Sequence, residues 1–335
     1  MGKIVLGIGT SHSPMLNSLA EDFIRHAEID QGKSNWQREL YNKEGQKCSY
    51  EYLLSVADPK VKNLITIENI TNRLKQCQAA IERIQTEIHS AQLDTLIIIG
   101  DDQREQFFED NMPAILIYWG KTIKNFPLQI PRNSPPYWIR ARAQYHEEKE
   151  PKEYPVDADL GSNLIDYLTK HGFDISQSTN LPKSRGEGHA FGFVHKRLLK
   201  SKKTPVIPII LNTYYPPNQP TAYRCRVLGQ ALRTAIENNG DTKRIGVIAS
   251  GGLSHFLIDE NLDRKVLAGC RMHDAKMLST IPSKNLVSGN SEIRNWIAMD
   301  GASEHLKCQW QEYIPCYRSE AATGCGMGFA VWRNV

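Results

Sequence analysis

The chain has 335 residues, 40% hydrophobic and 23% charged, a composition that excludes a disordered or fibrous protein. Lys and Arg outnumber Asp and Glu by only 41 to 37, and the excess is scattered, so nucleic acid is not an expected partner. No stretch approaches the roughly 18 apolar residues of a membrane helix, and the first residues turn polar too early for a signal peptide. The seven cysteines are odd in number and lack Cys-x-x-Cys spacing, which indicates reduced thiols and a cytoplasmic location.

Apolar runs and amphipathic stretches alternate along the first half of the chain. Residues 4–8 predict a buried strand, and residues 20–60 form a polar region with helical fragments. From Ile67 to Ile88, apolar residues recur at steps of three and four, which predicts a long amphipathic helix. Residues 96–99 and 114–118 predict two further strands, and the Pro-rich, charged residues 121–156 predict a long surface loop or lid.

The second half repeats this alternation. Strands are expected at 205–211, 245–249 and 326–332, and helices at 163–170, 221–237, near 260–279 and at 291–300. The pattern predicts one α/β domain over residues 1–335, with a mostly parallel or mixed central sheet and helices on both faces. Such sheets bind ligands beyond the carboxyl ends of their strands, so chemistry is sought there.

Polar side chains follow three of the predicted strands. His12 lies just past the first strand, and Asp101, Asp102 and Gln103 follow the strand at 96–99. His255 follows the strand at 245–249 after a glycine pair. Taken singly, a histidine in a loop or an aspartate capping a helix is the simpler interpretation. Ser254 beside His255 does not form a hydrolytic pair, because adjacent residues in an extended segment point apart.

Two further residues complete the set. His189 lies between glycines in the segment 186–194, and Glu292 begins an apolar-patterned helix, where a helix dipole alone would favour a carboxylate. Together the chain offers three histidines and one carboxylate, and N/O ligands with open positions suit a ferrous ion. A histidine not bound to the metal can serve as acid or base.

Several long motifs occur in one order along the chain. They are GTSHSPML (9–16), GDDQREQFFEDNMPA (100–114), GHAFGFV (188–194), VIPIILNTYYPPNQPTAYRCRVLGQAL (206–232), ASGGLSHF (249–256), the helix from Glu292 to Ala302 and ATGCGMGFA (322–330). Together they resemble the class III extradiol ring-cleavage dioxygenases, the superfamily of the protocatechuate 4,5-dioxygenase catalytic subunit. The start of the chain also resembles the 3-O-methylgallate dioxygenase branch.

The resemblance implies a ferrous ion held by two histidines and a glutamate, and cleavage of an aromatic ring beside two hydroxyls with dioxygen. His12 matches the first histidine ligand and Glu292 the glutamate ligand. His255 matches the acid/base histidine of the GGxSH motif, and His189 matches a second active-site histidine. The implied partners are a small aromatic diol and O2, and a homodimer is expected.

One position departs from the family pattern. The second histidine ligand should end an Asn-Asp-His motif, but the chain reads Asp101-Asp102-Gln103. Gln103 therefore stands at the ligand position, where its carbonyl would be a harder and weaker donor than imidazole. Asp101 or Asp102 could take its place, or the metal could be held by His12 and Glu292 with water.

The ring substituent has four candidate contacts: Tyr214, Tyr215, Arg318 and Thr323, although packing explains the tyrosines equally well. Arg318 or Lys183 could meet a carboxylate. Residues 20–60 and 121–156 are candidate covers of the active site. Two other functions remain open: a metal-dependent non-oxidative enzyme of hydrolase type, which the Gln103 change favours, and a non-catalytic binding homologue, which four retained polar residues disfavour.

Overall fold

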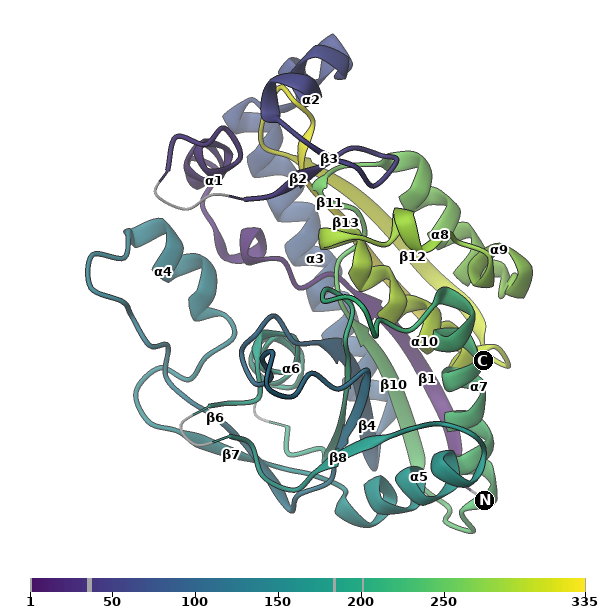
Figure 1. Cartoon of the computed structure of the whole chain (residues 1–335). Helices are drawn as coiled ribbons and strands as arrows, with labels where there is room; N and C mark the ends of the chain where they lie inside the picture. Colours follow the sequence, from purple (N-terminus) through teal and green to yellow (C-terminus); the bar gives the residue numbers. More distant parts are fainter. Residues whose placement is uncertain (1, 35–37, 183–184, 201, 335) are drawn as a thin grey trace.

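A nine-stranded mixed sheet crosses the molecule, with helices on both of its faces (Figure 1). The structure, a computed structural model, describes residues 2–34, 38–182, 185–200 and 202–334. The strand order is β11-β13-β1-β10-β4-β9-β5-β8, and β12 pairs with β13 along almost its whole length. The expected α/β architecture with a mostly parallel, mixed sheet is thereby confirmed.

Four parallel strands form the centre of the sheet: β1 (Lys3–Thr10), β10 (Arg244–Ser250), β4 (Thr95–Asp101) and β9 (Val206–Leu211). On one side β5 (Ile115–Tyr118) runs antiparallel to β9 and parallel to β8 (Ser176–Ser178). On the other side β13 (Thr323–Arg333) runs antiparallel to β1, β11 (His255–Leu257) and β12 (Lys307–Tyr317). The central strands therefore end at one edge, where polar residues can gather.

The two faces of the sheet carry separate apolar cores. Ile97 and Ile99 of β4 pack with residues of α5 (Ala158–Lys170), α7 (Ala222–Asn238), α8 (Glu260–Met272) and α10 (Ile293–Ser303). Their neighbours Leu96 and Ile98 pack with α3 (Ile67–Ala91) and α6 (His189–Phe193). Successive strand residues point to opposite faces, so an unbroken apolar run such as 96–99 serves both cores.

Most predicted elements are present, with three corrections. The predicted helix at 260–279 is two helices, α8 and α9 (Ala275–Ser279), because His273 adopts a left-handed conformation (φ 51°) and Asp274 caps α9. The helix expected from Glu292 begins at Ile293, after a 3-10 turn over Ser288–Glu292. Strand β12 was not predicted. It contains Pro315, which an edge strand tolerates, and among the described residues β12 pairs with β13 alone.

The prediction of a long surface loop at 121–156 is wrong. The segment forms a two-stranded sheet of β6 (Thr122–Asn125) and β7 (Lys152–Pro155), with α4 (Pro136–Ala143) between them. Alternate residues of β6 point inward, and Tyr145 and Tyr154 are buried. Prolines that suggested a loop stand at the start of α4, where their fixed φ fits the first helical turn.

Residues 20–60 also have regular structure. They form α1 (Asp22–Asp30), a hairpin of β2 (Leu40–Tyr41) and β3 (Lys47–Cys48), and α2 (Tyr50–Val56). Leu40 and Leu53 share a small core with Ala321, against which Phe256 and Leu257 of β11 pack. The segment therefore lies over the part of the sheet that carries His255. Short 3-10 turns complete the fold at Pro14–Asn17, Pro59–Leu64 and Ser283–Asn285, and a π-helical turn spans Val194–Leu199.

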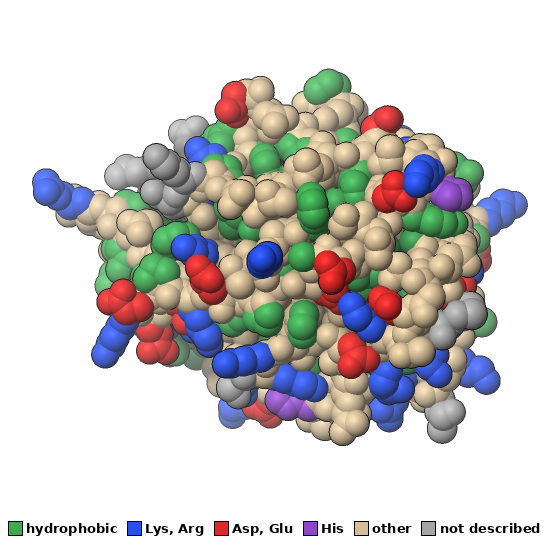
Figure 2. All heavy atoms as spheres, turned by 90° about the horizontal axis from the view of Figure 1, so that it is seen from below, with side chains coloured by type: hydrophobic (Ala, Val, Ile, Leu, Met, Phe, Trp, Pro, Cys, Tyr) green, Lys and Arg blue, Asp and Glu red, His purple; other side chains and the backbone are tan. Residues whose placement is uncertain are grey.

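The surface carries mixed charge on the face seen from below, where Lys and Arg side chains lie among Asp and Glu side chains (Figure 2). In the part of the chain that the structure describes, no helix combines the length and apolar character needed to cross a membrane.

Candidate active site

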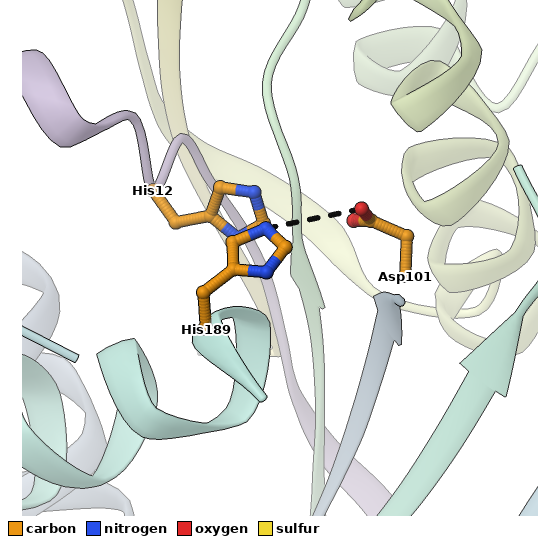
Figure 3. Close-up of side chains that lie close together, drawn as sticks. All are labelled: His12, Asp101 and His189. Atoms are coloured by element: carbon orange, nitrogen blue, oxygen red, sulfur yellow. Dashed lines mark ion pairs between the residues drawn. The ribbon is translucent and has the colours of Figure 1, made fainter. Parts of the chain in front are cut away.

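Three side chains from distant parts of the chain point toward one another at the carboxyl edge of the sheet (Figure 3). His12 follows β1, Asp101 is the last residue of β4, and His189 is the first residue of α6. One potential ligand atom from each lies within 4.8 Å of the others, and all three residues are buried. The strand ends thus bring together two of the predicted site histidines and one of the aspartates that were alternatives to Gln103.

Glu292, which directly precedes α10, joins this cluster. One carboxylate oxygen, Oε2, lies 3.2 Å from Nε2 of His12, and the other, Oε1, lies 3.1 Å from Nε2 of His255. Oε2 also accepts the backbone N–H of Gly252 at 2.6 Å. Glycine is needed at 252, because a Cβ there would lie 2.7 Å from the His255 ring. Glu292 is 1% exposed, so it is a buried carboxylate between two imidazoles.

The hydrogen bonds of His12 fix which of its nitrogens carries a proton. The Ser250 hydroxyl donates to the Ala190 carbonyl at 2.7 Å, so its oxygen accepts from Nδ1 of His12 at 3.0 Å. Burial lowers the pKa of His12, although the carboxylate of Glu292 acts in the opposite direction. Neutral His12 then turns an Nε2 lone pair toward Oε2 of Glu292. Nε2 of His12 and Oε2 of Glu292 are then two acceptors 3.2 Å apart, an arrangement suited to binding a cation.

His255, unlike His12, is protonated at the nitrogen that faces Glu292. Its Nδ1 donates to the Leu253 carbonyl at 2.9 Å, and its Nε2 faces Glu292 and the Tyr214 hydroxyl, which lies 3.3 Å away. Burial acts to lower the pKa of His255, but Glu292 and Cys325 together hold that pKa well above the ordinary value. Burial likewise acts to raise the pKa of Glu292, and His255 and His12 hold it well below the ordinary value. His255 therefore keeps a proton at Nε2 inside the site.

His189 is oriented by Glu105. One carboxylate oxygen of Glu105 accepts both the backbone N–H of His189, at 3.0 Å, and its Nδ1–H, at 2.6 Å. Burial opposes protonation of His189, but Glu105 outweighs it and raises the pKa to about 9. Nε2 of His189 is buried and has no hydrogen-bond partner among the described residues; it lies 3.8 Å from Oδ2 of Asp101. An unpartnered ring nitrogen in this position is available to a ligand.

The three residues at the end of β4 have different roles in the structure. Asp102 caps the following turn, because its carboxylate accepts the backbone N–H groups of residues 105–107. Asp101 is buried and accepts a hydrogen bond from the Asn295 side-chain amide at 3.3 Å. Burial and the nearby Glu292 raise the pKa of Asp101 to about 8. Gln103 is exposed, but its Nε2 lies 3.2 Å from Glu292 and 3.4 Å from Asp101, so it acts as a donor to both carboxylates.

The four candidate substrate contacts fall in three places. Tyr214 is in the cluster, where its hydroxyl donates to Glu292 at 2.6 Å. The guanidinium of Arg104 lies over the Tyr215 side chain, 4.6 Å from the centre of the Tyr215 ring. Arg318 binds the carboxylate of Asp30 through two nitrogens, and Thr323 is hydrogen-bonded to Ser319 at 2.7 Å. Lys183 lies outside the described residues.

Three contributing residues were not predicted. Ser250 belonged to a quoted motif, but nothing local in the sequence marks it as the partner of His12. Asn295 lies one helical turn after Glu292, so i,i+3 spacing would have suggested that both face the site. Glu105 pairs with a histidine 84 positions later, and no short-range signal indicates such a contact.

Both inserted segments touch the residues of the site. The Tyr145 hydroxyl donates to the carbonyl of His12 at 2.6 Å, and Gln144 donates to the carbonyl of Ser13. On the other side the guanidinium of Arg38 lies 3.9 Å from the centre of the Phe256 ring, next to His255. Residues 20–60 and 121–156 therefore each contact residues at or beside the site.

The chain is similar to known ring-opening enzymes. Residues 70–325 match the family described as the catalytic LigB subunit of aromatic ring-opening dioxygenase. A 2,3-dihydroxyphenylpropionate/2,3-dihydroxicinnamic acid 1,2-dioxygenase of Azotobacter vinelandii is 26% identical over 186 residues, 54% of this chain and 49% of that protein. The protein of that name from Comamonas testosteroni is 26% identical over 176 residues, 52% of this chain and 47% of the other.

A gallate dioxygenase of Pseudomonas putida is 31% identical over 115 residues, 32% of each chain. The chain thus spans about half the length, or less, of the curated relatives it matches.

Proposed function

This chain belongs to the family of the catalytic LigB subunit of aromatic ring-opening dioxygenases, and from that premise we propose that it is an Fe(II)-dependent extradiol dioxygenase of a catechol- or gallate-type substrate. The observation that carries the proposal is the 3.2 Å approach of His12 Nε2 to Glu292 Oε2, with Asp101 and His189 beside them. Four buried polar side chains from separate elements would be costly to bring together without a ligand to bind.

The residues present fit a ferrous ion. His12 and Glu292 are the proposed ligands, as the family resemblance implies, and Asp101 is the proposed third ligand. Asp101 is buried and has an oxygen within reach of His12, whereas Asp102 is committed to backbone N–H groups. Gln103 would instead orient the two carboxylates through its amide N–H. Nitrogen and carboxylate ligands that leave open positions are typical of non-haem iron oxygenases.

When bound, the ferrous ion would supply Lewis acidity for the two ring hydroxyls and redox chemistry for dioxygen. The protein's own contribution is to move protons and exclude water. His255 exchanges the proton at its Nε2 with a ring hydroxyl, as general acid and base, and Tyr214 orients it through their shared contact with Glu292. His189, fixed by Glu105, directs its Nε2 into the same space and hydrogen-bonds the substrates there.

The two inserted segments are proposed to cover the substrates. Residues 20–60 pack against β11, and residues 121–156 reach the backbone of His12, so each lies beside a residue of the proposed machinery. A homodimer is the proposed assembly. The cytoplasm is the proposed location, consistent with seven cysteines that are all free thiols.

Anaerobic loading with Fe(II), followed by addition of catechols and gallates, tests the function. We expect one ferrous ion per chain, oxygen uptake and a yellow ring-opened product. Metal binding without oxygen uptake over the whole panel would favour a non-oxidative, hydrolase-like enzyme instead. Failure to bind any divalent metal would favour a binding homologue without catalysis.

A further inference from the structure

A buried group of charges lies beside Phe256, the residue after His255. Asp30, at the end of α1, accepts hydrogen bonds from two arginines: Arg318, at 2.6 and 2.9 Å, and Arg38, at 2.7 Å. Both guanidinium groups also face the Phe256 ring, Arg38 at 3.9 Å and Arg318 at 5.8 Å from its centre. We call Arg38, Arg318 and Asp30 the arginine cluster.

The arginine cluster has more positive than negative charge. Two guanidinium groups share one carboxylate, and the nearby His26 is uncharged, since burial and then Arg318 lower its pKa to about 3. The neighbouring Asp22 does not supply the missing charge, because it binds Arg140 at 2.9 Å. Burial, and then repulsion from Arg318, lower the pKa of Arg38 to about 10. A further anion beside Arg38 would relieve this imbalance.

Of the two arginines, Arg38 is the one with access to a ligand. The side chain of Arg318 is 4% exposed, and two nitrogens of its guanidinium already donate hydrogen bonds to Asp30. The side chain of Arg38 is 22% exposed and uses one nitrogen for Asp30 among the described residues. A guanidinium presents five donors, which leaves capacity for a second carboxylate.

Arg38 is also on the side of the cluster that faces the active site. The Phe256 ring beneath it makes an edge contact with the His255 ring, with 5.2 Å between ring centres. The Tyr214 hydroxyl lies 3.3 Å from Nε2 of His255 and donates a hydrogen bond to Glu292. A substrate ring held near His255 and Tyr214 would therefore place a substituent within reach of Arg38.

We propose that Arg38 determines substrate specificity by binding the carboxylate of a catechol carboxylic acid, so that the enzyme selects aromatic acids over neutral catechols. This inference rests on the proposed function. Phenylpropionate, cinnamic acid and gallate in the names of the relatives all carry a carboxylate, which is the charge that the cluster lacks. Arg38 precedes the matched residues 70–325, so the family match assigns it no role.

The test compares each acid with its neutral isostere. Oxygen uptake is measured with 3,4-dihydroxybenzoate, gallate and 2,3-dihydroxyphenylpropionate and with the primary amide of each. We expect Arg38→Gln to raise KM for the acids by roughly 10–100-fold, the range for a hydrogen bond to a charged group, and to leave KM for the amides within about twofold. An equal change for acids and amides, or an unchanged acid-to-amide ratio, would overturn the proposal.

Three further variants control the result. Arg25→Gln is the matched control, because Arg25 belongs to α1, the helix that carries Asp30, is 61% exposed and pairs only with Glu28 among the described residues; it should change nothing. Arg38→Lys keeps the charge and should retain most of the preference for acids, even if Arg38→Gln folds poorly. Arg38→Glu should shift the preference toward an aminomethyl catechol.

Anaerobic calorimetry with the same acids and amides separates this proposal from the proposed function. If the wild-type protein consumed no oxygen with any compound, the ring-cleavage function would fail. Tighter binding of the acids that disappears in Arg38→Gln would still support the role of Arg38. Equal binding of acids and amides by the wild-type protein would refute it.

Discussion

The floor of the site and its rim are built in different ways. The floor consists of His12, Asp101, His189 and Glu292, which the ends of β1 and β4 and the starts of two helices bring together. The rim comes from residues 20–60 and 121–156, which reach the floor through single contacts such as Tyr145 to His12. The comparison suggests that the floor determines which reaction is possible, whereas the rim determines which substrate is admitted.

The largest effect is expected when the floor loses its central carboxylate. Glu292→Ala removes a proposed metal ligand and the partner of both His12 and His255. Affinity for Fe(II), measured by anaerobic titration, should fall by more than about 100-fold, beyond the range for residues that only support a ligand. Oxygen uptake should be lost with acids and amides alike.

Glu148→Ala is the control for that variant, because Glu148 is exposed and belongs to the segment 121–156. Metal affinity that survives in Glu292→Ala would mean that the floor does not bind the metal through this residue.

Substitution of the buried Asp30 in the rim should lower the free energy of unfolding but leave Fe(II) affinity unchanged. Asp30→Ala leaves two arginines without their shared carboxylate in a site where Asp30 is fully buried. Removing one partner of a buried ion pair typically costs about 3–5 kcal/mol, so urea unfolding should show a loss of that size. Fe(II) affinity of the folded variant should stay close to that of the wild-type protein; a loss as large as that of Glu292→Ala would erase the distinction between rim and floor.

A smaller effect is expected from the residue that orients His12. Ser250→Ala removes the acceptor of the His12 Nδ1–H and leaves the ring free to rotate. Such supporting residues typically contribute about 10–100-fold to metal affinity, and we expect a loss in that range with little change in the preference for acids over amides. Ser90→Ala, at an exposed position of α3, provides a comparison of the same substitution.

The smallest effect is expected where the rim meets the floor. Tyr145→Phe deletes the hydroxyl that donates to the His12 carbonyl at 2.6 Å and keeps the buried ring. The loss should be about 1 kcal/mol of unfolding free energy, the usual contribution of one hydrogen bond. Activity should fall only a few-fold; complete loss of oxygen uptake would show that the segment 121–156 takes part in the chemistry.

The same division explains what could be predicted from the sequence. Most central elements, and the positions of His12 and Asp101 in the floor, follow from local patterns, because apolar runs such as residues 96–99 end in polar residues. The roles of His189 and Glu292 came from the family resemblance. Strand ends that meet at one edge then place His12 and Asp101 together, whatever their separation in the chain.

The rim could not be predicted in this way. Arg38 stands in a polar region without periodicity, and its neighbour Arg318 is 288 positions from their shared partner Asp30. Local composition also misjudged residues 121–156, where prolines begin a helix and two short strands pair. Contacts of this kind depend on tertiary packing, which a single sequence does not encode as a local pattern.

The most direct test of the account is mass spectrometry of the product formed with isotopically labelled dioxygen. The Fe(II)-loaded protein is mixed with a catechol carboxylic acid under labelled O2, and the ring-opened product is analysed for label. We predict that both oxygen atoms of one dioxygen molecule enter the product and that Glu292→Ala forms none. A product that carries one labelled atom or none, or an intact ring after full loading with iron, would contradict the account.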